Sequence, residues 1–152
     1  MQTYSDGKRI YSVDMMFAYV NIFKPKYLKI KIDKMIHNLG FKCWGDPIKK
    51  IEFSPLDVMR KPTKYKLHME RIRMADLKYP IIAHIKNGQL LIIDGVHRLA
   101  KAKMENKKTM NVYIFDHVLL RKFLINSKGD WNKVDKTKSH KYIELFHKRF
   151  CK

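Results

Sequence analysis

The sequence predicts an α+β domain in which a small mixed β-sheet packs against helices. Segments with strand-like and helix-like patterns follow one another in a mixed order, without internal repeats or a Gly/Ser linker. The chain has 152 residues, enough for one domain with a sizeable core, and 45% of them are hydrophobic. This composition excludes a disordered chain. We therefore expect a single domain over residues 1–152, with its core over residues 50–116 and helical additions at both ends.

The first forty residues are predicted to form a helix, a strand and a second, short helix. Asp14 is expected to cap a helix over residues 15–22. Apolar residues alternate with lysines over residues 28–32, which is the pattern of a half-buried strand. Asp33 then stands where the N-cap of a short helix is expected, and Gly40 ends that helix.

The next stretch predicts an irregular segment followed by two helices. Residues 41–53 lack a regular pattern, and Gly45-Asp46-Pro47 indicates a turn. A helix is expected after Ser54, because this residue is a favoured N-cap, a proline follows it and an acidic residue falls in the first turn. A second helix is predicted over residues 64–75. The residues expected on its buried side are Leu67, Ile72 and Ala75.

The clearest local signal is a β-hairpin in the second half of the chain. Two strand-like segments, residues 80–86 and 90–93, flank Asn87-Gly88, a dipeptide typical of tight hairpin turns. The elements predicted after it are a helix over 97–105, a strand over 110–116, a helical continuation over 117–125, a polar surface loop over 126–141 and an amphipathic helix over 139–150.

The segment Asp94-Gly95-Val96-His97-Arg98 stands where a strand is predicted to meet a helix. A helix that starts near Val96 exposes backbone N–H groups without intrahelical partners, at the positive end of the helix dipole. Glycine lets a phosphate approach the backbone, and His97 and Arg98 can donate charge-assisted hydrogen bonds to it. Asp94 can cap the helix or contact a hydrated Mg²⁺. These four residue types, aspartate, glycine, histidine and arginine, together suit a nucleotide phosphate group.

An ordinary turn explains the same five residues. Asp-Gly after a strand is a common turn, and aspartate is a common N-cap. The segment matches neither GxxxxGK[ST] nor GxGxxG, the two established phosphate-binding patterns. Spacing alone therefore favours a turn over a site.

Several short motifs between residues 68 and 115 add to this pattern. They are, in chain order, Ala75-Asp76-Leu77, Tyr79-Pro80-Ile81-Ile82, Asn87-Gly88, Asp94-Gly95, His97-Arg98 and Lys101-Ala102. Together they resemble the ParB/sulfiredoxin-like superfamily, and the match covers about a third of the chain. The resemblance implies a compact ParB/sulfiredoxin-like α+β fold that binds nucleotide phosphates at the helix start after Asp94-Gly95.

The superfamily's known activities differ, and this sequence departs from each of them. Sulfiredoxins use ATP to repair an oxidised cysteine and carry a catalytic cysteine where this chain has Val96. Partition proteins hydrolyse CTP and continue into a helix-turn-helix domain, but only 37 residues follow Phe115. A free-serine kinase uses ADP and has a Pro-His-Glu element where this chain reads Pro62-Thr63-Lys64. Some members are called nucleases, and a binding-only descendant also fits.

The resemblance supplies a list of candidate site residues. Those expected to hold ATP or a related nucleotide are Asp94, Gly95, Val96, His97, Arg98 and Lys101, with Asp94 also as the contact for Mg²⁺. Those expected to act as acid or base in the transfer or cleavage of a phosphate are His97, Glu70, His68 and Asp76. His68 and Arg71 are three residues apart and share a helix face, which suits a general base or a phosphate clamp. A solvated helix face explains them equally well.

The charge of the chain supports a second hypothesis. The formal net charge is +19, from 33 basic and 14 acidic residues. A nucleic-acid-binding module, or a ParB-like nuclease acting on DNA or RNA, would use such a surface. However, 26 lysines and 7 arginines account for the basic residues and they are scattered, which is equally typical of a solvated surface.

Cysteine usage and hydropathy indicate the compartment. Cys43 and Cys151 lie far apart and form no CxxC pair, so a reducing environment is expected. The sequence has no segment typical of a signal peptide and no run of about 20 apolar residues. We expect a soluble intracellular protein, cytoplasmic or nuclear, with no membrane partner; the sequence does not indicate its oligomeric state.

Overall fold

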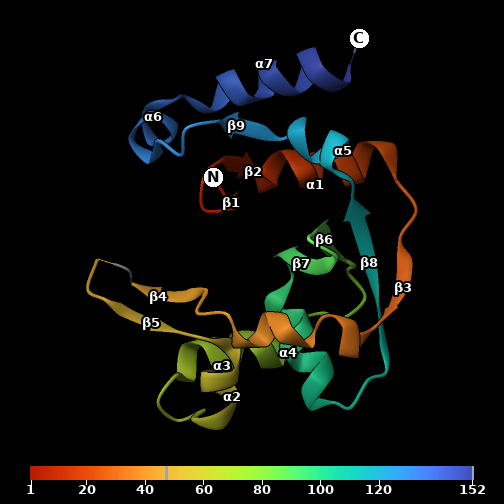
Figure 1. Ribbon diagram of the computed structural model, residues 1–152, viewed down its shortest axis with the longest axis vertical. Helices are drawn as coiled ribbons and strands as arrows, with labels where there is room; N and C mark the ends of the chain where they lie inside the picture. Colours follow the sequence, from red (N-terminus) through yellow and green to blue (C-terminus); the bar gives the residue numbers. More distant parts are fainter. Residues whose placement is uncertain (47, 152) are drawn as a thin grey trace. The chain divides into compact units, whose positions relative to one another are not determined.

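The chain is an α+β protein whose internal contacts divide it into two compact units. The computed structural model describes residues 1–46 and 48–151 (Figure 1). Unit 1 comprises Met1–Lys26 and Phe115–Lys152, and unit 2 comprises Tyr27–Ile114. The mixture of helices and small sheets confirms the predicted class, whereas a single domain over the whole chain stays a prediction. Within the described residues, no helix is long and apolar enough to cross a membrane.

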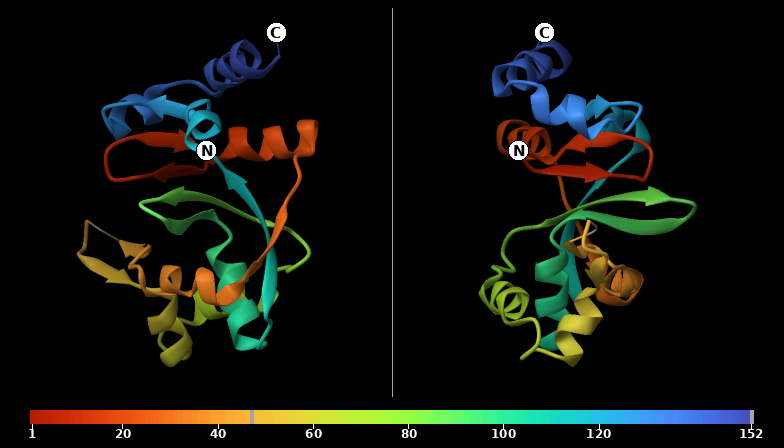
Figure 2. Two further views of the ribbon diagram at one scale, coloured as in Figure 1. Left: turned by 45° about the vertical axis from the view of Figure 1, so that its right-hand side comes forward. Right: turned by 90° about the vertical axis from the view of Figure 1, so that its left-hand side faces the viewer.

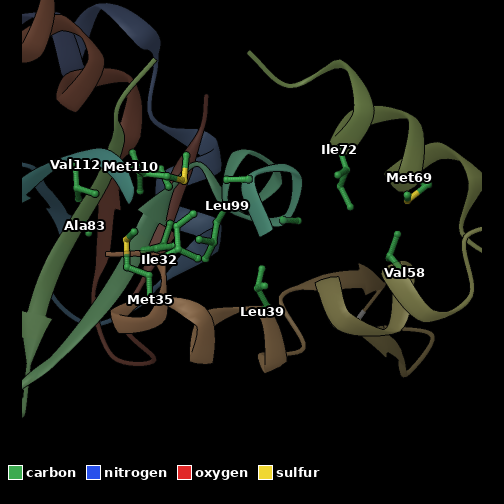
Figure 3. Packing of buried hydrophobic residues seen from close by; sticks show 14 of the residues in the cluster. Ile32, Met35, Leu39, Val58, Met69, Ile72, Ala83, Leu99, Met110 and Val112 are labelled. Atoms are coloured by element: carbon green, nitrogen blue, oxygen red, sulfur yellow. The ribbon is translucent and has the colours of Figure 1, made fainter. Parts of the chain in front are cut away.

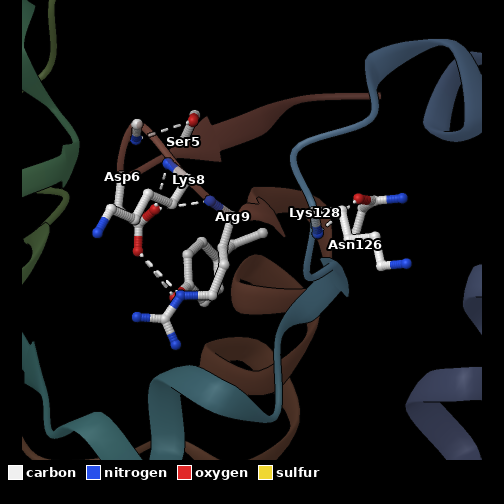
Figure 4. Close-up of polar contacts among 8 residues, drawn as sticks. Ser5, Asp6, Lys8, Arg9, Asn126 and Lys128 are labelled. Atoms are coloured by element: carbon white, nitrogen blue, oxygen red, sulfur yellow. Dashed lines mark hydrogen bonds and ion pairs between the residues drawn. The ribbon is translucent and has the colours of Figure 1, made fainter.

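Unit 1 contains a small antiparallel sheet in the order β1-β2-β9, with helices. Its elements are β1 (Thr3–Ser5), β2 (Ile10–Ser12), α1 (Val13–Phe23), α5 (His117–Arg121), β9 (Leu124–Asn126), α6 (Trp131–Lys136) and α7 (Ser139–Phe150). The connection between β1 and β2 is closed by Asp6, whose Oδ1 accepts the backbone N–H groups of Lys8 and Arg9 at 2.9 and 2.7 Å (Figure 4). These bonds replace backbone partners that the turn does not supply.

Aromatic side chains form the interior of unit 1. The ring of Tyr19 on α1 lies 5.8 Å from that of Phe115, 5.7 Å from Phe123 and 5.3 Å from Phe150 on α7, measured between centroids. Edge-on and tilted contacts of this kind stabilise a core beyond the burial of their area. Helix α7 has the bounds predicted for the last amphipathic helix, and its Phe146 is buried.

Unit 2 is built around a four-stranded sheet in the order β3-β8-β6-β7, which Figure 2 shows from two further sides. The strands are β3 (Leu28–Lys31), β6 (Ile81–Lys86), β7 (Gln89–Asp94) and β8 (Thr109–Phe115). The turn between β6 and β7 places Asn87 at φ 53° and Gly88 at φ 74°. Both residues are in the left-handed region that asparagine and glycine tolerate, so the predicted hairpin is confirmed.

Helices pack on this sheet and on one another. The remaining elements of unit 2 are the 3₁₀ helices η1 (Ile32–Lys34) and η2 (Ile36–Gly40), the strands β4 (Trp44–Asp46) and β5 (Ile51–Phe53), and the helices α2 (Pro55–Arg60), α3 (Lys66–Met74) and α4 (Val96–Met104). Leu99, Ala100 and Ala102 of α4 are buried in the same cluster as Val112 of β8 and Ile72 of α3 (Figure 3). The small alanines allow close packing of the helix.

The predicted cap of α2 is present. The hydroxyl of Ser54 accepts the N–H of Asp57 at 3.2 Å, and the carboxylate of Asp57 accepts the N–H of Ser54 at 2.8 Å. This is a reciprocal capping box with Pro55 at the first helical position. The hydrogen bonds from Ser54 keep the pKa of Asp57 below its usual value.

Residues 41–53 are not irregular, because β4 and β5 form an antiparallel hairpin in which Trp44 pairs with Phe53. Short strands held by cross-strand pairing carry no alternation signal that a sequence pattern would detect. Of the predicted turn, Gly45 and Asp46 belong to β4, and Pro47 lies outside the described residues. The hairpin projects from the α2–α3 side of unit 2 (Figure 1).

Other local predictions were also wrong. The cap of α1 is Ser12, whose hydroxyl accepts the N–H of Met15 at 3.1 Å, and not Asp14. Asp33 lies inside η1, and the N-cap of η2, the short helix that includes Gly40, is Met35. Residues 117–125 are not one helix, because α5 ends at Arg121 and β9 pairs with β2.

Two further errors concern burial and loops. The segment 126–141 contains α6, which Asp130 caps by accepting the N–H of Lys133 at 3.1 Å, so it is not a loop throughout. Leu67 of α3 is 65% exposed, whereas Met69 is buried beside Ile72. The sequence of α6 is mostly polar, so it shows little helical periodicity of apolar residues. The exchange of Leu67 for Met69 on the buried side corresponds to a rotation of α3 about its axis relative to the prediction.

Asn38 of η2 holds the outer edge of β7. Its amide nitrogen donates to the carbonyl of Leu90 at 3.0 Å and to that of Met35 at 2.8 Å, and its Oδ1 accepts the N–H of Ile92 at 3.1 Å. Asn38 is only 3% exposed. The side chain therefore supplies partners that a neighbouring strand would otherwise give.

Replacing Asn38 with alanine should destabilise unit 2 by about 1–3 kcal/mol, because the N–H of Ile92 loses its acceptor and the carbonyl of Leu90 keeps only its contact with His37. Urea unfolding followed by circular dichroism measures the change. Asn132→Ala on the exposed side of α6 is the matched control and should leave stability almost unchanged. Equal stability of both variants would show that β7 does not depend on this side chain.

Candidate functional site

The junction between β7 and α4 has an irregular backbone. Ile82 lies opposite Asp94 while Ala83 lies opposite Ile92, so Ile93 is an extra residue that bulges β7 just before the helix. Bulges bend a strand and redirect the side chains that follow. Gly95 then turns the chain with φ 112° as the N-cap of α4. A Cβ at this position would lie 2.9 Å from Cγ1 of Ile81, so packing as well as dihedral angle requires glycine.

The start of α4 leaves backbone donors without acceptors. The first intrahelical hydrogen bond of α4 runs from the N–H of Leu99 to the carbonyl of Gly95 at 3.0 Å, and no side chain caps the helix. Within residues 1–46 and 48–151, no acceptor is bonded to the amides of Val96, His97 and Arg98. Such amides at the positive end of a helix dipole attract an anion.

The side chain of Arg98 forms hydrogen bonds to groups of the protein itself. Its Nη1 donates to the carbonyls of Tyr79 at 3.0 Å and Pro80 at 2.8 Å, and its Nη2 donates to Oδ2 of Asp94 at 2.5 Å. The Arg98 and Asp94 side chains are 16% and 15% exposed, so the pair is well shielded from water. These contacts give Arg98 a structural role and leave its predicted contact with a phosphate without support.

Lys101 and Asp94 also form their contacts within the protein. The ammonium group of Lys101 donates to the carbonyl of Ala75 at 2.7 Å, which ties α4 to the end of α3. Asp94 faces the guanidinium of Arg98, so its charge is already balanced. Within the described part of the chain, no group of three or more His, Cys, Asp or Glu side chains could hold a metal ion. Because Mg²⁺ is commonly bound by one or two carboxylates together with substrate phosphates, the role of Asp94 as a contact for Mg²⁺ stays a prediction.

His68 of α3 and His97 of α4 meet beside the free amides. Nδ1 of His68 lies 3.4 Å from Nε2 of His97, and the two imidazole planes differ by only 6°. The indole of Trp44 stacks on both rings, with centroid distances of 4.4 Å in each case. Phe53 contacts His68 edge-on and stacks on Tyr65. The hairpin β4–β5 thus contributes the aromatic rings that cover one side of the histidine pair.

Both histidines are electrically neutral at pH 7. Burial, with smaller contributions from His68 and Arg71, lowers the pKa of His97 to about 4. Burial and Arg71 also lower the pKa of His68. A neutral imidazole accepts a proton but does not attract a phosphate as a cation would.

The other two predicted acid–base residues lie apart from this pair. Glu70 lines a shallow depression with Pro62, Thr63 and the side chains of Lys66 and Arg73. Asp76 accepts the N–H of Lys78 at 3.0 Å and pairs with its ammonium group at 3.6 Å in an exposed turn. Their catalytic roles stay predictions that no contact with the histidine pair supports.

Sequence reasoning missed Trp44 as part of the site. Strand β4 has no periodicity that would have placed this residue beside a histidine. Arg71 was recognised only through its helical spacing from His68. Its charge now reaches both histidines, and no ion pair with an acidic side chain is formed by Arg71 in the described ranges.

Comparisons with known proteins give limited information. No protein-family model matches the chain, and no curated protein matches it either. Among solved structures, sulfiredoxin from Arabidopsis thaliana is similar, with 19% sequence identity over 64% of this chain and 94% of that chain. The TM-score of 0.33 is low, and we build no conclusion on this similarity.

The low pKa of His97 predicts that stability falls in mild acid. The unfolded chain takes up a proton on this residue as the pH drops below its usual pKa of 6.5, whereas the folded chain resists until about pH 4. Stability is therefore fully present above pH 6.5 and declines between pH 6.5 and 4. Urea unfolding across this range should show a shallower decline for His97→Gln.

His140→Gln is the matched control for this experiment, because His140 is exposed on α7. It should keep the pH dependence of the parent chain. An unchanged slope in His97→Gln would mean that burial does not keep this imidazole neutral.

Proposed function

We propose that this chain is a nucleotide-binding protein that holds a phosphate group at the start of α4. The observation that carries the proposal is the set of three amides, of Val96, His97 and Arg98, for which no described residue provides an acceptor. Phosphate oxygens accept hydrogen bonds from such amides and gain from the helix dipole. The ParB/sulfiredoxin-like motifs of the sequence support the same reading, because they imply phosphate binding at this helix start.

Arg71 is the cation best suited to complete this site. Arg98 and Lys101 are bonded to carbonyl groups of the protein, so their donors face inward. Arg71 is exposed, and its charge lowers the pKa of both His68 and His97. A phosphate beside the histidine pair would therefore meet the guanidinium of Arg71, which can bind it in a bidentate manner.

His68 would provide a proton acceptor for phosphate transfer or nucleotide hydrolysis, because a pKa of about 4 makes His97 a weak base. A neutral imidazole can take a proton from an attacking hydroxyl or water, and a second imidazole at hydrogen-bond distance can orient it. His68 and His97 meet these requirements at 3.4 Å. If Mg²⁺ accompanies the nucleotide, Asp94 is the carboxylate that would contact it.

A basic nucleic-acid-binding module or a nuclease is the second candidate. The net charge of +19 favours it, because 33 lysines and arginines face only 14 acidic residues and most of them have no acidic partner in the sequence. Unpaired surface lysines attract a phosphate backbone without reading its sequence.

Nucleotide titration followed by ¹⁵N NMR tests the first proposal. Adding ATP, ADP, CTP or GTP should shift the amide resonances of Val96, His97 and Arg98, since these groups would donate to the phosphate. The amides that begin α7, at Ser139 and His140, also start an uncapped helix and serve as the internal control. Shifts confined to α7, or none at millimolar nucleotide, would contradict phosphate binding at α4.

Arg71→Ala should weaken nucleotide binding by about tenfold, because a charge-assisted contact is lost. Arg73→Ala on the same helix is the matched control, since Arg73 lines the depression with Glu70 and not the histidine pair. Thermal shift with and without Mg²⁺ measures both. Equal loss in the two variants would indicate a general effect of charge.

Electrophoretic mobility shifts with double-stranded DNA and with RNA test the second candidate. Binding through lysines to the backbone should weaken steeply as salt rises from 50 to 200 mM, by roughly a thousandfold if about six phosphates are contacted. Incubation of plasmid with Mg²⁺ tests cleavage in parallel. The absence of any complex at low salt would remove this candidate.

A further inference from the structure

Unit 1 contains a cavity that the proposed function does not use. Its volume is about 660 Å³, and side chains of α1, α6 and α7 line it. Cavities of about 300–1,000 Å³ accommodate small organic molecules. Most of the lining is apolar, and Ile22, Trp131 and Ile143 at its rim are 59%, 46% and 60% exposed. The cavity therefore presents apolar surface that is not covered within unit 1.

The charged groups around this cavity differ from those of the rest of the chain. None of the described residues that line it is a lysine or an arginine, although the chain has 33 of them, and its basic groups are the N-terminal amino group of Met1 and the imidazole of His147. Asp14 and Asp135 supply carboxylates. Oδ2 of Asp14 accepts the N–H of Gln2 at 3.2 Å, and the carboxylate of Asp135 has no hydrogen bond or ion pair to any described residue. The cavity lining is thus far less basic than the chain as a whole.

Aromatic side chains add a second attraction for cations. Trp131, Tyr142 and Phe146 all line the cavity, from α6 and α7. Aromatic faces attract ammonium groups, with tryptophan the strongest, and the attraction grows where water is excluded. Asp14 and Asp135 are both exposed, so water screens part of their attraction for a cation and the aromatic rings carry the rest.

We propose that this cavity binds a small organic ammonium compound, with its apolar body against α1 and α7 and its ammonium group near Asp14 and Asp135. The size of the cavity suits the body, and the absence of lysine and arginine among its described lining residues reduces the repulsion that a cation meets elsewhere on the chain. An anionic ligand of the same shape would be repelled by two carboxylates.

Isothermal titration calorimetry with three probes of one shape tests the proposal on the full chain. The probes are 4-phenylbutylamine, 4-phenylbutan-1-ol and 4-phenylbutyrate, which differ only in the charge of one end. The amine should bind most tightly and the acid at least about tenfold more weakly, since like charges repel. Equal affinity for amine and acid, or no saturable heat from the amine at millimolar concentration, would overturn the proposal.

Variants locate the binding. The double variant Asp14→Asn/Asp135→Asn should lower the affinity for the amine about fivefold while leaving that for the alcohol unchanged, which also shows that the cavity is intact. Asp33→Asn in unit 2 removes one carboxylate elsewhere and should change neither. Ala18→Phe fills the cavity and should abolish binding of all three probes. An amine affinity that survives both the double variant and Ala18→Phe would place the amine elsewhere.

A second copy of the chain is the competing occupant of this surface. Sedimentation at the protein concentration of the titration distinguishes the two. A monomer that binds the amine supports the proposal. A dimer that Ala18→Phe or Ile143→Asp dissociates, and that does not bind the amine, would show that the apolar walls form an interface between chains.

Discussion

The guanidinium group of Arg98 fixes the junction on which the candidate site depends. It joins the carbonyls of Tyr79 and Pro80, which precede β6, to the carboxylate of Asp94 at the end of β7. Because Arg98 itself belongs to the first turn of α4, these bonds attach the helix to both strands of the hairpin. Planar, multiple hydrogen bonds of this kind define orientation as well as distance. The free amides at the start of α4 are therefore held by the sheet, and they do not depend on a ligand for their position.

The surroundings of these amides are unusual for so basic a chain. His68 and His97 are neutral because burial and the charge of Arg71 oppose their protonation, and the indole of Trp44 covers them. A site of neutral imidazoles and backbone donors is suited to proton transfer beside an anion, whereas a site of lysines would bind the anion without accepting a proton. The two arginines therefore have different roles. Arg98 forms hydrogen bonds within the protein, whereas Arg71 is exposed and can reach a ligand.

The parts of the fold that local chemistry determines could be predicted from the sequence. Asn87-Gly88 specifies a hairpin turn, Ser54 with the following proline specifies the start of α2, and the DGVHR segment specifies a strand-to-helix junction. The parts that depend on distant partners could not. Strand β4 exists because Trp44 pairs with Phe53, and η2 secures β7 through Asn38, 52 and 54 residues away from its partners. No local pattern encodes such contacts.

The same distinction applies to the site. Helical spacing predicted that His68 and Arg71 share a face, and the structure brings His68 to His97. Helical spacing could not predict that backbone carbonyls would accept the hydrogen bonds of Arg98 and Lys101, because the positions of those carbonyls follow from the tertiary fold. A charged residue in a motif can bind a ligand or form hydrogen bonds to the protein's own backbone. Only the positions of its partners in the structure distinguish these two roles.

A crystal structure of the chain soaked with a mixture of nucleotides tests the central claim most directly. The account predicts phosphate oxygens at about 3 Å from the amide nitrogens of Val96, His97 and Arg98, with the Arg98 guanidinium still bonded to the carbonyls of Tyr79 and Pro80. Nucleotide density elsewhere on the chain, or an Arg98 side chain that leaves these carbonyls to reach the phosphate, would contradict it.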